Sequence, residues 1–319
     1  MLRTIRFNET SAKLIENQSR VKPPGPGEIC WIDLQQYQPE ELHALGDAMG
    51  FHQLAIADCE HPIERAKLDD YEKYLFIVMH SMNLNVNGRR GIQSVELDSF
   101  LGEKYLVTVH QEPIPAIDAL IKRAATDASC GARGADFLFY LILDALVDEA
   151  FPIVDKLSDQ IEDVETAILR RSEPGQLAQL MRLKRLLIAM RRVLSPERDV
   201  LAMMIRRGDP RLQDRTAIYF RDVYDHVVRA YEQIDVERDL LGNAMDAYMS
   251  MNAQRSNVIM KQLTLLASIF LPLTFLTGFF GQNFSALPFD SRSLFYIEIG
   301  ACILLPVAMV YWFRRSGWW

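Results

Sequence analysis

The chain has 319 residues, 49% of them hydrophobic, and a formal net charge of −7. Its mean hydropathy of −0.02 is that of a soluble protein, but this average combines a polar body with an apolar C-terminal tail. The acidic balance argues against a nucleic-acid partner, because phosphate backbones attract basic surfaces, and it fits a body that meets cations.

Residues 1–134 have the mixed texture of an α/β domain. A helical pattern covers Pro39–Met49, and Phe100-Leu101-Gly102-Glu103-Lys104 indicates a hairpin turn with glycine at its bend. Runs of β-type residues predict four strands, at Leu2–Phe7, Ile29–Leu34, Tyr74–His80 and Tyr105–His110. The N-terminus lacks the apolar core of a secretory signal, so we expect this domain to be cytosolic. Its scattered cysteines should be reduced packing residues: Cys30, Cys59 and Cys130, with Cys302 in the tail.

Helical periodicity replaces the β-type texture from residue 135 onward. Ala135–Arg171 and Pro174–Arg207 predict two long helices, which form a cytosolic helical hairpin over residues 135–210. Proline and glycine interrupt the pattern at Ser172-Glu173-Pro174 and at Gly208-Asp209-Pro210, where these helices should end.

A single helix can run from Arg211 to Phe280, because this stretch has one glycine and no proline before Pro272. At 1.5 Å per residue it would be about 100 Å long, and we assign residues 211–262 to a stalk. Coiled-coil spacing continues into the apolar region at Met249, Ala253, Met260, Ala267, Leu271 and Thr274. Polar residues lie on or beside this seam, at Asp246, Ser250, Asn257 and Thr264. In a pore formed by three or more helices, water on the central axis would hydrate these polar residues. The alternative is a dimeric coiled coil in which a few polar residues set the register.

Two apolar runs near the C-terminus each approach the ~20 residues that a helix needs to cross a bilayer. Leu263–Phe280 has no charged residue, and Leu294–Phe313 has only Glu298, near its start. We therefore expect an integral membrane protein with transmembrane helices at 263–283 and 294–313, an external loop at 284–293 and a basic-aromatic tail at 314–319. The flanking basic residues predict that both termini face the cytoplasm of a bacterial inner membrane: Arg255, Lys261, Arg314 and Arg315.

The end of the first apolar run reads Pro272-Leu273-Thr274-Phe275-Leu276-Thr277-Gly278-Phe279-Phe280-Gly281-Gln282-Asn283-Phe284. This segment closely resembles the end of the first membrane helix in CorA-type divalent-cation transporters, whose signature is Gly-Met-Asn. Phe220-Arg221-Asp222-Val223-Tyr224-Asp225-His226 is similar to the start of that family's stalk helix, and Glu64-Arg65-Ala66-Lys67 to its Gln-Arg-Pro-Lys segment. The resemblance implies a funnel-shaped homopentamer: an α/β cytosolic domain, a long helical stalk and two transmembrane helices, the first lining the pore.

The resemblance also implies roles for single residues at the pore. Gly281, Gln282 and Asn283 would form the outer mouth, where the Asn283 amide oxygen contacts the hydration shell of the ion and Gly281 permits the turn that ends the helix. A helix C-cap is the alternative role for Asn283. The positions that line the family's pore are Asp246, Asn257, Met260, Leu263, Leu271 and Thr274. The apolar members of this set would gate by dewetting.

The mouth departs from the family pattern in ways that bear on the substrate. Gln282 replaces methionine, Phe280 replaces the usual tyrosine, and the acidic Pro-Glu-Leu segment after the signature is absent. The field that attracts cations should therefore be weaker. Mg²⁺ is the expected substrate, with Co²⁺ and Ni²⁺ as further candidates. A zinc transporter of the same fold is the alternative, because relatives that vary the middle residue of the signature include zinc transporters.

Three cytosolic residues, Asp58, Asp222 and His226, match positions of an intersubunit metal sensor in that family. A bound cation would hold these carboxylates together and close the pore, whereas ordinary solvated acids are the alternative. Asp58-Cys59-Glu60-His61 has soft-metal chemistry, but four adjacent residues rarely converge on one ion. A further acidic helical face would attract cations, and the alternative is that it is an ordinary solvated surface. Its residues are Asp155, Asp159, Glu162, Asp163 and Glu165.

The sequence has no nucleotide-binding loop, nucleophile elbow or His-Glu-x-x-His motif, so we expect a transporter and not an enzyme. The expected partners are a lipid bilayer, divalent cations and further copies of the chain. A hypothesis of another class is a membrane-anchored coiled-coil signalling or scaffold protein. Such an anchor needs no polar residues facing an axis inside the bilayer, whereas a pore does.

Overall fold

The structure, a computed structural model, describes residues 1–8, 11–16, 21–63, 65–84, 91–282 and 291–318. The chain forms two compact units. The first comprises Met1–Ala167 and Glu173–Met245, and the second comprises Ile168–Ser172 and Asp246–Trp319. The chain passes from the first unit to the second around Ile168–Ser172 and again within one long helix, α8, which spans Asp214–Phe280.

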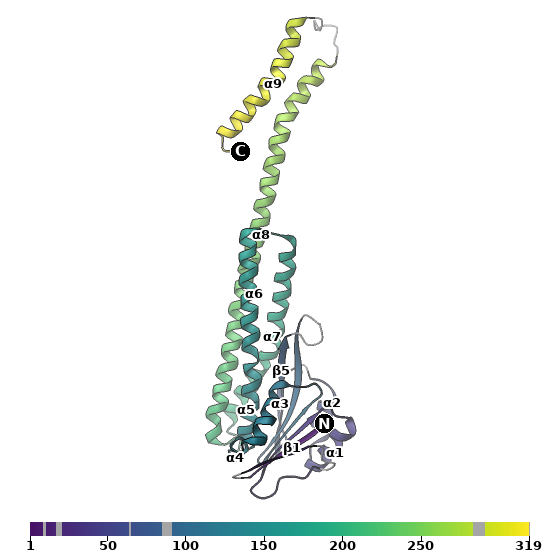
Figure 1. Cartoon of the computed structure of the whole chain (residues 1–319), viewed down its shortest axis with the longest axis vertical. Coiled ribbons are helices and arrows are strands. Elements are labelled where there is room, and N and C mark those ends of the chain that lie inside the picture. The colour runs from purple at the N-terminus through teal and green to yellow at the C-terminus, as the bar shows by residue number, and fades with distance from the viewer. Residues whose placement is uncertain (9–10, 17–20, 64, 85–90, 283–290, 319) are drawn as a thin grey trace. The chain divides into compact units, whose positions relative to one another are not determined.

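A seven-stranded sheet organises the first unit, in the order β2-β1-β3-β7-β6-β5-β4 (Figure 1). The strands are β1 Leu2–Phe7, β2 Ala12–Glu16, β3 Ile29–Gln35, β4 Lys67–Asp70, β5 Tyr74–Leu84, β6 Ile92–Gly102 and β7 Tyr105–His110. β3 and β7 pair in parallel, and the other neighbours pair antiparallel. The four predicted strands are confirmed, and so is the predicted hairpin turn before Tyr105, which joins β6 to β7. β2, β4 and β6 were not predicted.

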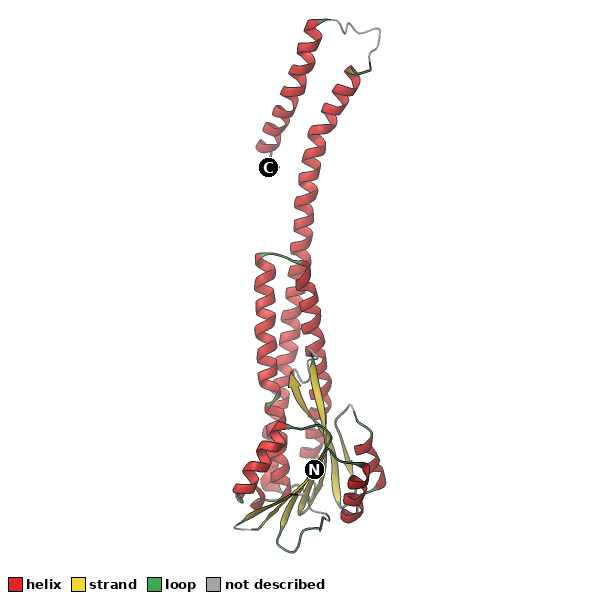
Figure 2. Cartoon of the chain, turned by 45° about the vertical axis from the view of Figure 1, so that its right-hand side comes forward, coloured by secondary structure: helices red, strands yellow, loops and turns green. Residues whose placement is uncertain are grey.

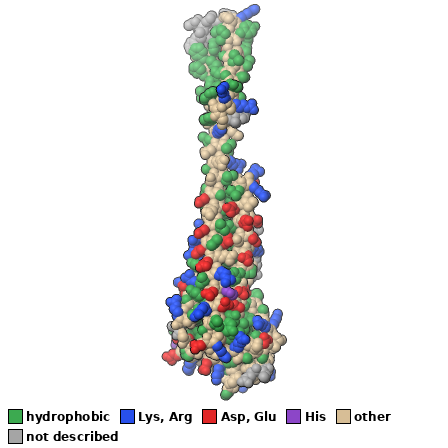
Figure 3. All heavy atoms as spheres, turned by 90° about the vertical axis from the view of Figure 1, so that its left-hand side faces the viewer, with side chains coloured by type: hydrophobic (Ala, Val, Ile, Leu, Met, Phe, Trp, Pro, Cys, Tyr) green, Lys and Arg blue, Asp and Glu red, His purple; other side chains and the backbone are tan. Residues whose placement is uncertain are grey.

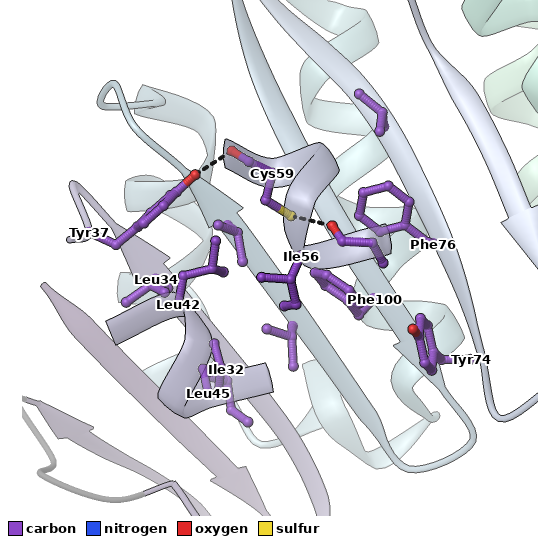
Figure 4. Packing of buried hydrophobic residues seen from close by; sticks show 14 of the residues in the cluster. Ile32, Leu34, Tyr37, Leu42, Leu45, Ile56, Cys59, Tyr74, Phe76 and Phe100 are labelled. Atoms are coloured by element: carbon purple, nitrogen blue, oxygen red, sulfur yellow. Dashed lines mark hydrogen bonds between the residues drawn. The ribbon is translucent and has the colours of Figure 1, made fainter. Parts of the chain in front are cut away.

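Helices cover both faces of this sheet. α1 (Pro39–Met49, as predicted) and α2 (Gln53–Glu60) pack on one face, where Leu42 and Ile56 meet Phe76 and Phe100 in an apolar core (Figure 4). α3 (Pro115–Thr126), the short α4 (Ser129–Ala132) and α5 (Ala135–Asp148) contact the strands from the other face. Residues of the central strands β3, β5 and β7 alternate between the two faces of the sheet, and both sets are buried, as the two-residue period of a strand predicts.

Long helices continue the chain beyond the sheet (Figure 2). They are α6 Ala150–Arg170, α7 Pro174–Arg207 and α8. The prediction of one helix over Ala135–Arg171 was wrong, because the chain breaks between α5 and α6 at Glu149. Pro152 supplies the reason: it has no N–H to donate to the Asp148 carbonyl, and its ring would clash with that carbonyl in a continuous helix. α7 ends at Gly208, whose φ of 56° is left-handed and favours glycine.

The second unit contains the C-terminal part of α8 and helix α9, which spans Arg292–Arg315. Both helices are long and apolar enough to cross a membrane. Hydrophobic side chains cover them on the face that Figure 3 shows. Near the end of α9, Lys261 Nζ donates to the Gly317 carbonyl at 3.3 Å, and Leu265 and Phe313 are buried. Most other large apolar side chains here are exposed, including Leu271 and Leu304. Such a surface requires lipid or further protein to cover it.

Candidate ion pathway and cytosolic metal cluster

The residues predicted to line a pore all lie on α8 within the second unit, and every one is exposed: Asp246, Asn257, Met260, Leu263, Leu271 and Thr274. Leu271, with 72% of its surface accessible, is the most open of the three apolar members. Side chains of this stretch also line a pocket that includes Leu263, Ala267 and Leu271. This face of α8 is therefore accessible, either to other copies of α8 or to water in a pore.

Threonine hydroxyls on this part of α8 donate to the helix backbone four residues earlier. Thr274 Oγ1 donates to the Phe270 carbonyl at 2.9 Å, and Thr264 Oγ1 donates to the Met260 carbonyl at 2.8 Å. A hydroxyl has a single hydrogen, so in this geometry its oxygen presents only acceptor lone pairs outward. Thr274 thus offers an acceptor to a cation or to the water around it, without an orphaned donor.

The described part of the predicted mouth ends at Gln282. Gly281 N–H bonds to the Thr277 carbonyl at 2.9 Å, and Gln282 N–H bonds to the Phe279 carbonyl at 3.3 Å, so helical bonding persists here. Gly281 does not have a positive φ. A side chain at position 281 would instead place its Cβ only 3.1 Å from the Thr277 carbonyl oxygen, which is the constraint that favours glycine. Gln282 is exposed. Asn283 lies outside the described residues.

The three predicted sensor residues do not form one group within a single chain. Asp58, in the last turn of α2, pairs with Lys67 Nζ at 2.6 Å, and Lys67 also pairs with Asp69 at 2.9 Å. Asp222 and His226 lie one turn apart on α8. The predicted Asp58–Asp222 contact joins two subunits, so a single chain does not test it. The adjacent Glu60 and His61 bond elsewhere, to His43 at 3.1 Å and to the Ala57 carbonyl at 3.0 Å, so the Asp58–His61 motif does not converge.

His226 instead faces two carboxylates of α5 that the sequence analysis did not identify. His226 Nδ1 lies 3.7 Å from Asp148 Oδ1 and 4.0 Å from Asp144 Oδ1, and the ligand atoms of the three residues lie within 4.8 Å of one another. His226 Nδ1 is buried without a hydrogen-bond partner among the described residues. Burial, then the neighbouring Asp148, raises the pKa of Asp144, and Asp222 adds to this effect. These groups could hold a divalent cation, whose charge would offset the repulsion between the carboxylates.

The signal for this cluster was present in the sequence as Asp144 and Asp148, one helical turn apart. It was missed because nothing in the sequence places that turn beside His226. The acidic face of α6 is mostly exposed; its Asp155 accepts from Gln233 of α8 at 3.3 Å. That arrangement is typical of a solvated face between packed helices.

Known proteins that resemble this chain over most of its length are transport proteins for metal ions. The family model described as CorA-like Mg²⁺ transporter protein matches residues 26–315. The cobalt/magnesium transport protein CorA of Thermotoga maritima is 31% identical over 292 residues, covering 90% of this chain and 83% of that protein. The zinc transport protein ZntB of Yersinia pseudotuberculosis is 25% identical over 290 residues, covering 91% and 88%. The solved CorA magnesium transporter of Methanocaldococcus jannaschii shares the fold, with a TM-score of 0.85 over 99% of this chain and 98% of that chain, at 24% identity.

Proposed function

The chain belongs to the CorA-like Mg²⁺ transporter family, and from this premise we propose that it conducts hydrated Mg²⁺ across a bilayer through a pore lined by α8. Members of this family are transporters of divalent cations and not enzymes. Mg²⁺ is the proposed substrate, and Co²⁺ and Ni²⁺ are further candidate substrates. The proposed location is a bacterial inner membrane, with both termini in the cytoplasm.

The exposed stripe on α8 is the observation that carries this proposal. It runs from the stalk, where Asp246 and Asn257 are exposed, into the apolar part of α8, where Leu271 and the polar Thr274 are exposed. Polar groups facing lipid cost free energy, whereas around a wetted axis they remain hydrated. Several copies of α8 around a wetted axis would cover the apolar side chains and keep the polar side chains hydrated. The family resemblance favours five copies. The apolar rings at Met260 and Leu271 would then close the pore by excluding water.

Amide oxygens at the mouth suit an ion that keeps its water. Mg²⁺ dehydrates reluctantly, so a site that accepts hydrogen bonds from its hydration shell can select it without stripping it. Asn283 and Gln282 supply such acceptors. Asn283 is proposed as the residue that holds the hydrated ion.

The substitution Asn283→Ala tests this role, since a methyl group accepts no hydrogen bond from bound water. We expect Mg²⁺ uptake into liposomes to fall by at least about tenfold, while native mass measurement still gives a pentamer. Asn252→Ala is the matched control, because Asn252 is exposed on α8 away from the seam. Normal uptake by a pentameric Asn283→Ala protein would rule out the proposed role, and a wild-type dimer would rule out the pore.

Zinc is the second candidate substrate, and Gln282 is the feature that favours it. It replaces the methionine of the signature, and a zinc transport protein is among the relatives at 25% identity. Uptake assays in liposomes with Mg²⁺, Co²⁺, Ni²⁺ and Zn²⁺ in competition distinguish the two. Transport of Zn²⁺ that excess Mg²⁺ does not inhibit would favour zinc.

The cluster of Asp144, Asp148 and His226 is proposed as a cytosolic regulatory metal site, extended by Asp222. Support comes from the short distances between these groups and from the unpartnered His226 Nδ1. A cation bound there would hold α5 against α8 and favour one arrangement of the helices, because a ligand shifts an equilibrium by its differential affinity for two states. Asp58 would join a second site across the subunit interface only after it releases Lys67.

A further inference from the structure

The C-terminal end of α9 is an ordered cap that fixes its basic and aromatic side chains. Gly317, whose φ of 72° is left-handed, follows the last turn of the helix. Its N–H bonds to the Arg314 carbonyl at 3.4 Å, and the N–H of Trp318 bonds to the Phe313 carbonyl at 3.0 Å. These two bonds, with the rings of Trp318 and Phe313 6.1 Å apart, form the Schellman motif that ends many helices. The residues that follow the apolar part of α9 therefore have a defined conformation.

Lys261 of α8 joins this end of α9 from the neighbouring helix. Its Nζ donates to the Gly317 carbonyl at 3.3 Å. A lysine ammonium has three N–H donors, so two remain for another acceptor. Arg314 and Arg315, in the last turn of α9, are exposed, and their side chains form no hydrogen bond or ion pair with the described residues. Lys261, Arg314 and Arg315 thus form one cationic surface, which we call the basic cap.

The charge of the basic cap is not balanced by acidic side chains of the second unit. Among the described residues of this unit, acidic side chains occur only at Asp246 and Glu298. Asp246 precedes Lys261 by 15 positions and Glu298 precedes Arg314 by 16, which is about 22–24 Å along a helix. Salt screens interactions between exposed charges beyond roughly 10 Å. The basic cap is therefore a surface that attracts anions from its surroundings.

An exposed apolar stripe on α9 leads to the basic cap. It consists of Leu304, Val307 and Tyr311, whose exposed fractions are 61–69%. Their spacing of three and four residues places them on one face of the helix. Arg315 is four positions beyond Tyr311, so it ends the same face. Figure 3 shows hydrophobic side chains over this part of the second unit and basic side chains where it ends. The order of the stripe and the cap matches a phospholipid, in which acyl chains adjoin a phosphate.

We propose that the apolar stripe and the basic cap bind an anionic phospholipid of the cytoplasmic leaflet. An acyl chain lies along the stripe, and the phosphate accepts charge-assisted hydrogen bonds from the basic cap. A headgroup with net negative charge, such as phosphatidylglycerol, suits three cations better than a zwitterionic one, whose own ammonium lies beside the phosphate. Because the cap combines Lys261 of α8 with two arginines of α9, the lipid also joins the two helices. This inference goes beyond the proposed transport and rests only on the proposed membrane location.

Native mass spectrometry of the full-length protein in non-ionic detergent tests lipid binding without any transport. Dioleoyl phosphatidylglycerol and dioleoyl phosphatidylcholine are titrated separately, because they share their acyl chains and differ in net charge. We expect phosphatidylglycerol to bind at least about tenfold more tightly, since each Lys or Arg near an anionic lipid strengthens the attraction several-fold. Inorganic phosphate should not displace it, because phosphate has no acyl chain for the stripe. Equal affinities for the two lipids, as expected if another copy of the chain covers the stripe, or displacement by inorganic phosphate would overturn the proposal.

Charge variants locate the site on the chain. Lys261→Gln combined with Arg314→Gln and Arg315→Gln should weaken phosphatidylglycerol binding by at least about tenfold and leave phosphatidylcholine binding unchanged. Lys261→Arg combined with Arg314→Lys and Arg315→Lys keeps the charge and should retain the binding. Arg292→Gln is the matched control, because Arg292 is an exposed arginine at the opposite end of α9.

Thermal unfolding in the same detergent verifies that each variant is folded. The pair Arg314→Gln and Arg315→Gln, which removes no contact between described side chains, gives the same test with a smaller loss. Unchanged phosphatidylglycerol affinity in these folded variants, or an equal loss in Arg292→Gln, would show that the basic cap does not hold the lipid.

Discussion

Gln282 is the residue at which the choice between Mg²⁺ and Zn²⁺ can be tested most directly. Its side chain is exposed at the end of α8 and offers an amide where the family signature has a thioether. Gln282→Met should remove one acceptor for the water around the ion and shift the ratio of Mg²⁺ to Zn²⁺ uptake several-fold, roughly 1 kcal/mol in relative barrier height. Paired uptake assays in liposomes measure this ratio. An unchanged ratio would mean that the Gln282 side chain faces away from the ion path.

Glu197 of α7 is fully buried and accepts a hydrogen bond from the backbone N–H of His80 at 2.9 Å. Burial raises its pKa to about 8. Between the ordinary carboxyl pKa of about 4.5 and this value, the folded chain keeps a proton that the unfolded chain releases. The free energy of unfolding should therefore fall as the pH rises from 5 to 8.

The substitution Glu197→Gln should remove the part of this decline that Glu197 causes, because the amide never ionises and can still accept from His80. The variant should match the parent near pH 5 and exceed its stability at pH 8 by on the order of 2 kcal/mol. Thermal unfolding at the two pH values measures the difference. Glu112→Gln, an exposed carboxyl of the same unit, is the control; parallel pH profiles for the parent and Glu197→Gln would contradict the prediction.

At the scale of elements, the contact between α4 and β1 has no spare room. A Cβ at Gly131 would lie 2.0 Å from the ring of Phe7, which is buried. Gly131→Ala should therefore destabilise the first unit by about 1–3 kcal/mol, the usual cost of overpacking. Gly242→Ala in α8 meets nothing within 4 Å and should be neutral or stabilising by up to ~1 kcal/mol. Chemical denaturation of both variants measures the difference, and equal stabilities would show that the sheet adjusts freely.

At the scale of the whole molecule, the cluster on α5 and α8 should link cytosolic metal to the state of the helices. Added Mg²⁺ or Co²⁺ should slow proteolysis of the wild-type protein, and Asp144→Asn with Asp148→Asn should remove most of this protection, because the amides carry no charge. Asp159→Asn on the exposed face of α6 is the control. Undiminished protection in the double variant would place regulation elsewhere, for example at Asp58 and Asp222 of neighbouring subunits.

The long helix, the two spans and the family signature could be read from the sequence because each is a local property. An unbroken run of helix formers specifies α8, and uncharged stretches specify the apolar part of α8 and helix α9. The strands at Leu2–Phe7 and Tyr105–His110 were predicted with their observed bounds, since they consist of uninterrupted β-type residues. β6 was missed because its mixture of Glu96, Asp98 and apolar residues lacks that simple pattern.

Only the tertiary structure decided which distant polar groups meet. The sheet register sets His80 opposite Glu96, and the packing of α2 places Cys59 beside a cavity that Asp98 also lines. The packing of α5 against α8 brings Asp144 and Asp148 to His226. These contacts join residues far apart in the chain, and the burial that shifts their protonation exists only in the folded state. Local sequence patterns carry no record of such distances, whereas they do carry the length and apolarity that specify a membrane helix.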